Sequence, residues 1–274
     1  MKNLFIEFFV SLALVSSLHV VGHPVDNGEE ARPEDFKYHV VIRRKGQYIC
    51  SGALIADSHV LTAAHCVKKD KKHLSVLAGT TNLWRYEDDD ESQARLVAKV
   101  LKVHIPSKTH IQTLTNIAFN TKYYLGDIAV LKLDRPLGKS SRVSKLKLAS
   151  SLAEAETSGT VAGYAHLGSK DGRLIFGPKL LYTRVNVMKN NDCQELHRSA
   201  YRVNFCANSP RDSRQIVPVG VCQGDSGSPL VQGDRVVGVL SSGPKKCGYN
   251  ALPGIYVSVS TYKDFIDCVV QEDS

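Results

Sequence analysis

Short apolar runs separated by turn-forming residues fill most of the chain after its first 24 residues. Glycine, proline, asparagine, aspartate and serine stand between the runs, which are clearest at 38–42, 53–55, 75–77, 96–100, 128–133, 180–187 and 236–240. Strands of this length with turn signals between them are typical of a β-barrel or β-sandwich. The pattern therefore predicts an all-β protein.

The two ends of the chain depart from this strand pattern. Lys2 precedes an apolar run over 4–15, broken by Glu7, and small residues follow it. This is typical of a secretory signal peptide covering residues 1–22, with cleavage after Ser17 as a close alternative. The run is shorter than the roughly 20 apolar residues that span a bilayer, so we expect a secreted, extracellular protein, with a signal anchor as the alternative.

The other end predicts a short C-terminal helix. Over 261–270, Tyr262, Phe265 and Val269 recur at helical spacing, and a Thr-x-x-Asp start resembles a capping box. Cys268 lies in this segment and is left over if the other six of the seven cysteines pair. We expect a half-buried free thiol, with an intermolecular bridge as the alternative.

Two segments of the chain are strongly charged. The formal net charge is +8, and a lysine run at 68–73 is either a solvated surface or a weak attractor of polyanions. An acidic block at 87–91 is either a solvated loop or a calcium site, although its spacing does not match a ligand set. No aromatic residues interleave with the lysines, so we expect no nucleic-acid partner.

The strongest chemical signal is the turn Gly224-Asp225-Ser226-Gly227. A serine hydroxyl is a poor nucleophile unless a base takes its proton and donors stabilise the resulting oxyanion. Gly224 would let the backbone turn so that its N–H and that of Ser226 point at one position. Alone, the motif is equally compatible with a tight polar turn held by Cys222.

Two upstream segments supply what the serine needs. His65 precedes Cys66 after an apolar run, and Asp127 stands at the mouth of an apolar strand. A catalytic histidine needs an acid that orients it, and the chain order histidine, aspartate, serine is one of the few known for that triad. Each residue alone is ambiguous, whereas the three together, with Cys50 placed before Cys66, predict a catalytic triad of His65, Asp127 and Ser226.

With these motifs the chain resembles the trypsin/chymotrypsin family of serine endopeptidases from Val25 to the C-terminus. The resemblance implies two six-stranded antiparallel β-barrels, over about 25–140 and 141–274, that cross near 138–144 and hold the triad between them. It implies oxyanion donors at Gly224 and Ser226, and neither a cofactor nor a metal ion. Partners would be a protein or peptide substrate and macromolecular protease inhibitors, and the protein would be a monomer.

The resemblance also implies the disulfides, namely Cys50–Cys66, Cys193–Cys206 and Cys222–Cys247. Another bridge common in the family lacks both partners, because Gly159 and Gln232 stand where its cysteines would be.

The primary specificity pocket carries over to Gly220, Val221, Ser241, Gly243 and Gly254. Gly220 occupies the floor, so no carboxylate waits for a lysine or arginine side chain. An open, uncharged slot favours large apolar residues before the scissile bond, because burying their area is favourable. The resemblance is therefore to a chymotrypsin-like pocket and not to a trypsin-like one.

Activation in the family frees an amino group that pairs with the acid before the nucleophile, which makes Val25 and Asp225 the expected pair. Pro24, however, precedes Val25 where an activator of the trypsin type needs arginine or lysine. If the signal is cut after Gly22, residues 23–24 form a propeptide that a proline-specific dipeptidyl peptidase would remove. In the alternative, the segment is never trimmed and the protein stays a zymogen.

Three features keep a second function open, that of a catalytically silent homologue that acts by binding. Ser228 and Ser242 replace a glycine and a tryptophan usual in the family, and the N-terminus is atypical. A non-glycine at 228 would strain the backbone by about 1 kcal/mol. The segment from 105 to 125 is also long for the family and is interpreted as a loop that restricts access to the site.

Overall fold

The computed structural model describes residues 28–68, 72–83, 96–107, 126–138, 140–170, 173–196, 203–209, 220–221, 224–244 and 252–273. The predicted signal peptide and propeptide, Val25, the acidic block, Cys222, Cys247 and most of the segment before Asp127 lie outside these residues. In chain order the elements are β1 (Glu29–Glu30), β2 (His39–Arg44), β3 (Gln47–Ala56), β4 (His59–Thr62), α1 (Ala64–Val67), β5 (Leu74–Ala78), β6 (Val97–His104), β7 (Ala129–Leu133), β8 (Lys147–Leu148), β9 (Ser158–Lys170), β10 (Arg173–Val187), α4 (Asn190–Leu196), β11 (Asn204–Asn208), β12 (Pro229–Gln232), β13 (Arg235–Ser242), β14 (Gly254–Ser258), a 3-10 turn (Ser260–Tyr262) and α5 (Lys263–Glu272).

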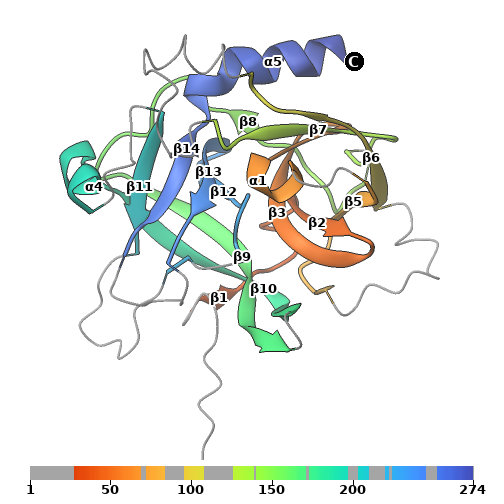
Figure 1. Cartoon of the computed structure of the whole chain (residues 1–274), viewed down its shortest axis with the longest axis horizontal. Coiled ribbons are helices and arrows are strands. Elements are labelled where there is room, and N and C mark those ends of the chain that lie inside the picture. The colour runs from red at the N-terminus through yellow and green to blue at the C-terminus, as the bar shows by residue number, and fades with distance from the viewer. Residues whose placement is uncertain are drawn as a thin grey trace, which may run out of the picture.

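Six antiparallel strands close the first barrel in the order β2-β3-β4-β7-β6-β5 (Figure 1). Its interior is filled by aliphatic side chains with no exposed surface, among them Val40, Leu54, Leu61 and Val130. Burial of this apolar area provides the main driving force for closing the barrel.

The second barrel runs β9-β10-β11-β14-β13-β12 and returns to β9, while β1 pairs with β10 and β8 pairs with β13. Its core includes Val185, Leu230, Leu240 and Tyr256. The predicted class, two six-stranded antiparallel barrels with a short C-terminal helix, is confirmed.

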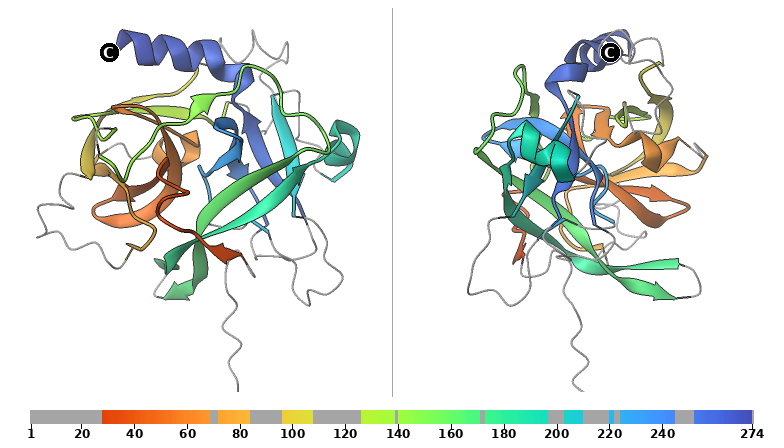
Figure 2. Two further views of the ribbon diagram at one scale, coloured as in Figure 1. Left: turned by 180° about the vertical axis from the view of Figure 1, so that it is seen from behind. Right: turned by 60° about the vertical axis from the view of Figure 1, so that its left-hand side comes forward.

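The hairpin β9–β10 is longer than the barrel requires, with strands of 13 and 15 residues. Its far end projects from the body (Figure 2). The strand register shifts on both sides of Phe176, so the hairpin is bulged there. Bulges re-aim side chains, and Phe176 turns toward the other barrel, where its ring lies 4.7 Å from that of Tyr48.

The C-terminal helix connects the two barrels. The chain leaves β14 in the second barrel, and α5 ends where Asp273 accepts hydrogen bonds from Lys102 Nζ and His104 Nε2 of the first barrel, at 2.5 and 2.8 Å. Among the described residues, no helix is long and apolar enough to cross a bilayer.

Two local predictions for this helix are wrong. No side chain caps α5, since the 3-10 turn begins at Ser260 and Thr261 is already inside a turn. Cys268 is free as expected but exposed rather than half-buried, because Ile266 and Val269 form the buried face.

His39 is a buried titratable group between the barrels. It is 1% exposed, and its ring lies 5.8 Å from the ring of Tyr164 on β9. Burial lowers the pKa of His39 from 6.5 to about 3, because desolvation penalises the charged imidazolium. The folded protein therefore holds this ring neutral at pH values where the unfolded chain protonates it.

We predict that His39 weakens the fold as pH falls. Below about pH 6.5 the unfolded state binds more protons, so the free energy of unfolding should decrease by up to about 1.4 kcal/mol per pH unit until the folded pKa is reached. Denaturant unfolding between pH 4.5 and 7.5 measures this slope, which should be shallower by about 1 kcal/mol per pH unit in His39→Gln. Equal slopes for the two proteins would contradict the assignment.

Candidate active site

The first barrel brings His65 and Asp127 together at one edge. Strands β4 and β7 are antiparallel neighbours, with Thr62 opposite Ala129. His65 follows Thr62 by three residues and Asp127 precedes Ala129 by two, so both leave the sheet at the same end. The Cys50–Cys66 disulfide attaches the short helix α1, which carries His65, to β3.

The carboxylate of Asp127 is buried, with 4% of its side chain exposed, and it is held by three donors. His65 gives its backbone N–H to Oδ1 at 2.8 Å and its ring Nδ1 to Oδ2 at 2.7 Å. The Ser241 hydroxyl also donates to Oδ2, at 2.6 Å. Because a carboxylate only accepts, Nδ1 carries the proton and Nε2 is left as the acceptor, which is the tautomer of a general base.

Ser241 is predicted to line the primary pocket, which stays a prediction, and its hydroxyl has a further contact with the Asp127 carboxylate that was not predicted. Strand β13 of the second barrel carries Ser241, so this hydrogen bond also joins the two barrels. No local pattern in the sequence signals this contact, which spans 114 residues.

The turn that carries Ser226 packs directly against the first barrel. The Ser51 N–H donates to the Ser226 carbonyl at 2.9 Å. A Cβ added at Gly227 would lie 2.2 Å from the Ser51 carbonyl oxygen and 2.3 Å from Thr62 Oγ1. Gly227 also has φ of 82°, which favours glycine. Only glycine allows this approach, which places Ser226 beside the segment leading into α1.

The structure thus brings the three predicted triad residues to one junction. Within the described part of the chain, no hydrogen bond joins the Ser226 hydroxyl to His65, whose Nε2 lies 3.7 Å from Cys66 Sγ. Catalytic hydrogen bonds are often long or absent in ligand-free enzymes and tighten when substrate binds.

Asp225, predicted for the activation pair, is 1% exposed. Its carboxylate lies against Gly163, where an added Cβ would be 1.9 Å from Oδ1. Its predicted partner, Val25, lies outside the described residues.

The predicted pocket residues lie close together. Val221 is buried, with 4% of its surface exposed. A Cβ added at Gly254 would lie 2.6 Å from Val221 Cγ2, and a Cβ added at Gly243 would lie 3.5 Å from the same atom. Around Gly220 no described atom lies within 4 Å of such a Cβ. The Val221 side chain therefore lies against both Gly243 and Gly254.

The strain expected at Ser228 is absent. Among the described residues, positive φ values occur at the non-glycines Lys45, His73 and Glu156 only, and Ser228 is not one of them. Its hydroxyl is instead buried with no hydrogen-bond partner in the described structure. An unsatisfied buried hydroxyl costs about 1–3 kcal/mol of folding stability. Serine in place of glycine at position 228 therefore lowers stability through its hydroxyl and not through backbone strain.

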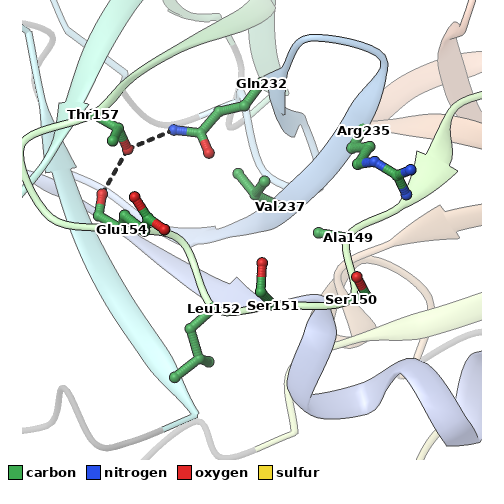
Figure 3. A pocket seen from close by; sticks show the side chains of 9 residues that line it. All are labelled: Ala149, Ser150, Ser151, Leu152, Glu154, Thr157, Gln232, Arg235 and Val237. Atoms are coloured by element: carbon green, nitrogen blue, oxygen red, sulfur yellow. Dashed lines mark hydrogen bonds between the residues drawn. The ribbon is translucent and has the colours of Figure 1, made fainter.

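The position of the missing disulfide is bridged by hydrogen bonds. The Gln232 amide donates to Thr157 Oγ1 at 2.8 Å and to the Ser158 carbonyl at 3.2 Å. A surface cavity of about 310 Å³ adjoins this contact (Figure 3), with Arg235 at its far side. The lining includes no predicted site residue, so we assign it no role in catalysis.

Two of the three predicted disulfides, Cys50–Cys66 and Cys193–Cys206, are present. The third lies outside the described residues. The sulfur atoms of Cys50 and Cys66 lie near His65, but both are used in the disulfide and offer no thiolate to a metal ion.

Tyr48 is a site residue that the sequence did not indicate. Its hydroxyl donates to the Gly224 carbonyl at 2.7 Å across a separation of 176 residues.

Comparison with known proteins gives the family. The profile of the family described as Trypsin matches residues 25–266. Kallikrein-4 of Homo sapiens is 27% identical over 247 residues, which cover 89% of this chain and 87% of that protein. Human heparin binding protein has a TM-score of 0.68 at 27% identity, over 89% of this chain and 96% of the other.

Neuropsin, a serine protease expressed in the limbic system of mouse brain, has a TM-score of 0.71 at 24% identity, over 89% of this chain and 99% of the other. This likeness supports the fold. Since the family profile covers most of the sequence, the chain belongs to the trypsin family of serine endopeptidases.

Proposed function

We propose that the protein is a secreted serine endopeptidase that hydrolyses peptide bonds through Ser226, His65 and Asp127. The observation that carries this is the hydrogen bond of 2.7 Å from His65 Nδ1 to the buried Asp127 carboxylate, beside the turn that holds Ser226. Proteases of this family act on protein or peptide substrates and are bound by protease inhibitors.

In the proposed mechanism the Ser226 hydroxyl attacks the substrate carbonyl and His65 Nε2 takes its proton. The Gly224 and Ser226 N–H groups stabilise the oxyanion, and Asp127 stabilises the imidazolium. His65 then protonates the leaving amine, which departs and leaves an acyl-enzyme. Water, deprotonated by His65, attacks the acyl-enzyme, and its collapse releases the acid and returns the proton to Ser226.

Labelling by a fluorophosphonate tests the nucleophile. The mature protein should react stoichiometrically at Ser226 and cleave a peptide library. Ser226→Ala should abolish labelling and should hydrolyse peptides only about 10³–10⁴-fold faster than uncatalysed hydrolysis in water. Ser228→Ala is the matched control, because it removes a serine of the same motif whose hydroxyl is buried, and it should keep full labelling. The proposed endopeptidase activity would be refuted by a trimmed protein that takes up no probe and cleaves no peptide.

The second candidate is a silent homologue that binds a polyanion. The formal charge of +8 and the likeness to human heparin binding protein favour it. Retention on a heparin column by a folded protein that is inert toward the phosphonate would support this candidate over the first.

The proposed specificity is for large apolar residues before the scissile bond, with Val221 limiting their width. Val221→Ala removes two methyl groups between Gly243 and Gly254, and should raise kcat/KM for phenylalanine over leucine substrates by about tenfold. Profiling both proteins with one peptide library measures this ratio. A profile dominated by arginine or lysine, or a ratio that Val221→Ala leaves unchanged, would contradict the proposed pocket.

Activation is proposed to require a chain that begins at Val25, whose amino group would pair with the buried Asp225. A chain that begins at His23 cannot form this ion pair, which in the family orders the turn with the oxyanion donors, so it should react with the phosphonate at least about 100-fold more slowly. The two forms can be prepared by proteolytic trimming and their N-termini sequenced. Equal labelling rates for the two forms would overturn this mechanism.

A further inference from the structure

Tyr48 lies beneath the turn that carries the proposed oxyanion donors. It belongs to β3, and its hydroxyl donates to the Gly224 carbonyl at 2.7 Å. The same oxygen is 2.9 Å from Ser51 Oγ. A phenol has one proton to donate, so when it serves Gly224 the Ser51 hydroxyl is the donor in the second contact.

Aromatic rings surround this phenol and fix its direction. The Tyr48 ring meets those of Tyr164 and Phe176 edge-on, with centroids 5.4 and 4.7 Å away. Burial is the main cause that raises the pKa of Tyr48 well above its usual value, and the nearby Asp225 adds to it. The phenol therefore stays a protonated donor across the pH range in which a protease works.

Phe176 contacts the same turn from the projecting hairpin. A Cβ added at Gly224 would lie 2.5 Å from Phe176 Cε1, and Gly224 has φ of 110°, a conformation that L side chains rarely adopt. Gly224 is thus held at its α-carbon by a ring of the second barrel and at its carbonyl by a phenol of the first.

The position of that carbonyl in the chain gives the contact its significance. The Gly224 carbonyl belongs to the peptide unit between residues 224 and 225. The two proposed donors, the N–H groups of Gly224 and Ser226, belong to the units directly before and after it. Because each peptide unit is planar, fixing the middle one restricts the directions in which the two donors point.

We propose that Tyr48 is a positioning residue of the oxyanion hole, which holds the Gly224–Asp225 peptide unit so that both donors converge on the reacting oxygen. This role rests on the proposed endopeptidase activity, since it concerns stabilisation of the transition state. The Tyr48 hydroxyl contacts the Gly224 carbonyl and the Ser51 hydroxyl, so we expect its loss to affect transition-state binding and not substrate binding.

The test measures the affinities of two inhibitors for three proteins, which are the wild type and the variants Tyr48→Phe and Tyr164→Phe. A tripeptide aldehyde forms a tetrahedral adduct with Ser226 and places an oxyanion in the hole, whereas the matched peptide alcohol fills the same subsites without one. Tyr48→Phe keeps the ring contacts. It should lower the affinity for the aldehyde by about tenfold and kcat by about tenfold. The affinity for the alcohol and KM should stay within about twofold of the wild-type values.

Tyr164→Phe is the matched control. Its hydroxyl belongs to a neighbouring buried tyrosine and donates to the Thr80 carbonyl at 3.2 Å, away from Gly224. This variant should leave the ratio of aldehyde to alcohol affinity unchanged even if it lowers the melting temperature. Selective ¹⁵N-glycine labelling adds a readout that needs no activity, because the Gly224 amide signal should shift in Tyr48→Phe and not in Tyr164→Phe.

Two results would overturn the proposal. One is an unchanged ratio of aldehyde to alcohol affinity in Tyr48→Phe, whether neither inhibitor is weakened or both are weakened equally. The other is the same shift of the ratio in the Tyr164→Phe control. A wild-type protein that binds neither the aldehyde nor the phosphonate would refute the endopeptidase itself, and the oxyanion role with it. The inhibitor ratio in an active wild type therefore distinguishes failure of the Tyr48 role from failure of the proposed function.

Discussion

The approach of the Ser226 turn to strand β3 sets the geometry on which the proposed site depends. At Gly227 the two barrels are so close that an added Cβ would lie 2.2 Å from the Ser51 carbonyl oxygen. Any side chain there would push the barrels apart and carry Ser226 away from His65. The hydrogen bond from the Ser51 N–H to the Ser226 carbonyl holds the turn at the same edge of β3. The small size of this glycine thus determines whether the two barrels can approach closely enough to form one site.

Buried polar groups connect the stability of this junction to its chemistry. The Asp127 carboxylate would be costly to bury alone, but it accepts hydrogen bonds from His65 in the first barrel and from Ser241 in the second. The carboxylate that orients the histidine therefore also joins the two barrels. Tyr48 repeats this arrangement at the neighbouring turn, where a first-barrel phenol satisfies the Gly224 carbonyl. Weakening either contact should affect packing and reactivity together.

The departures from the family pattern are each accommodated locally. Where a disulfide is missing, Gln232 replaces it with hydrogen bonds to Thr157 and the Ser158 carbonyl. Ser228 adopts an unstrained backbone and instead buries an unsatisfied hydroxyl. The Val221 side chain lies against Gly243 and Gly254. These changes leave the His65–Asp127 pair in place, which is why the enzymatic proposal is preferred to the binding one.

The sequence by itself determined the features that depend on local pattern. The apolar runs marked seven strands, and the residue types around His65, Asp127 and Ser226 indicated their chemistry, since alternation of burial and turn residues is written into neighbouring positions. Only the tertiary structure decided the role of Ser241, the contact of Tyr48 with Gly224, the exposure of Cys268 and the relaxed backbone at Ser228. Those outcomes depend on which atoms of distant segments meet in space, across 114 residues for Ser241 and 176 for Tyr48. One sequence carries no local signal for such contacts, because hydrogen-bond partners and burial are set by how the two barrels pack.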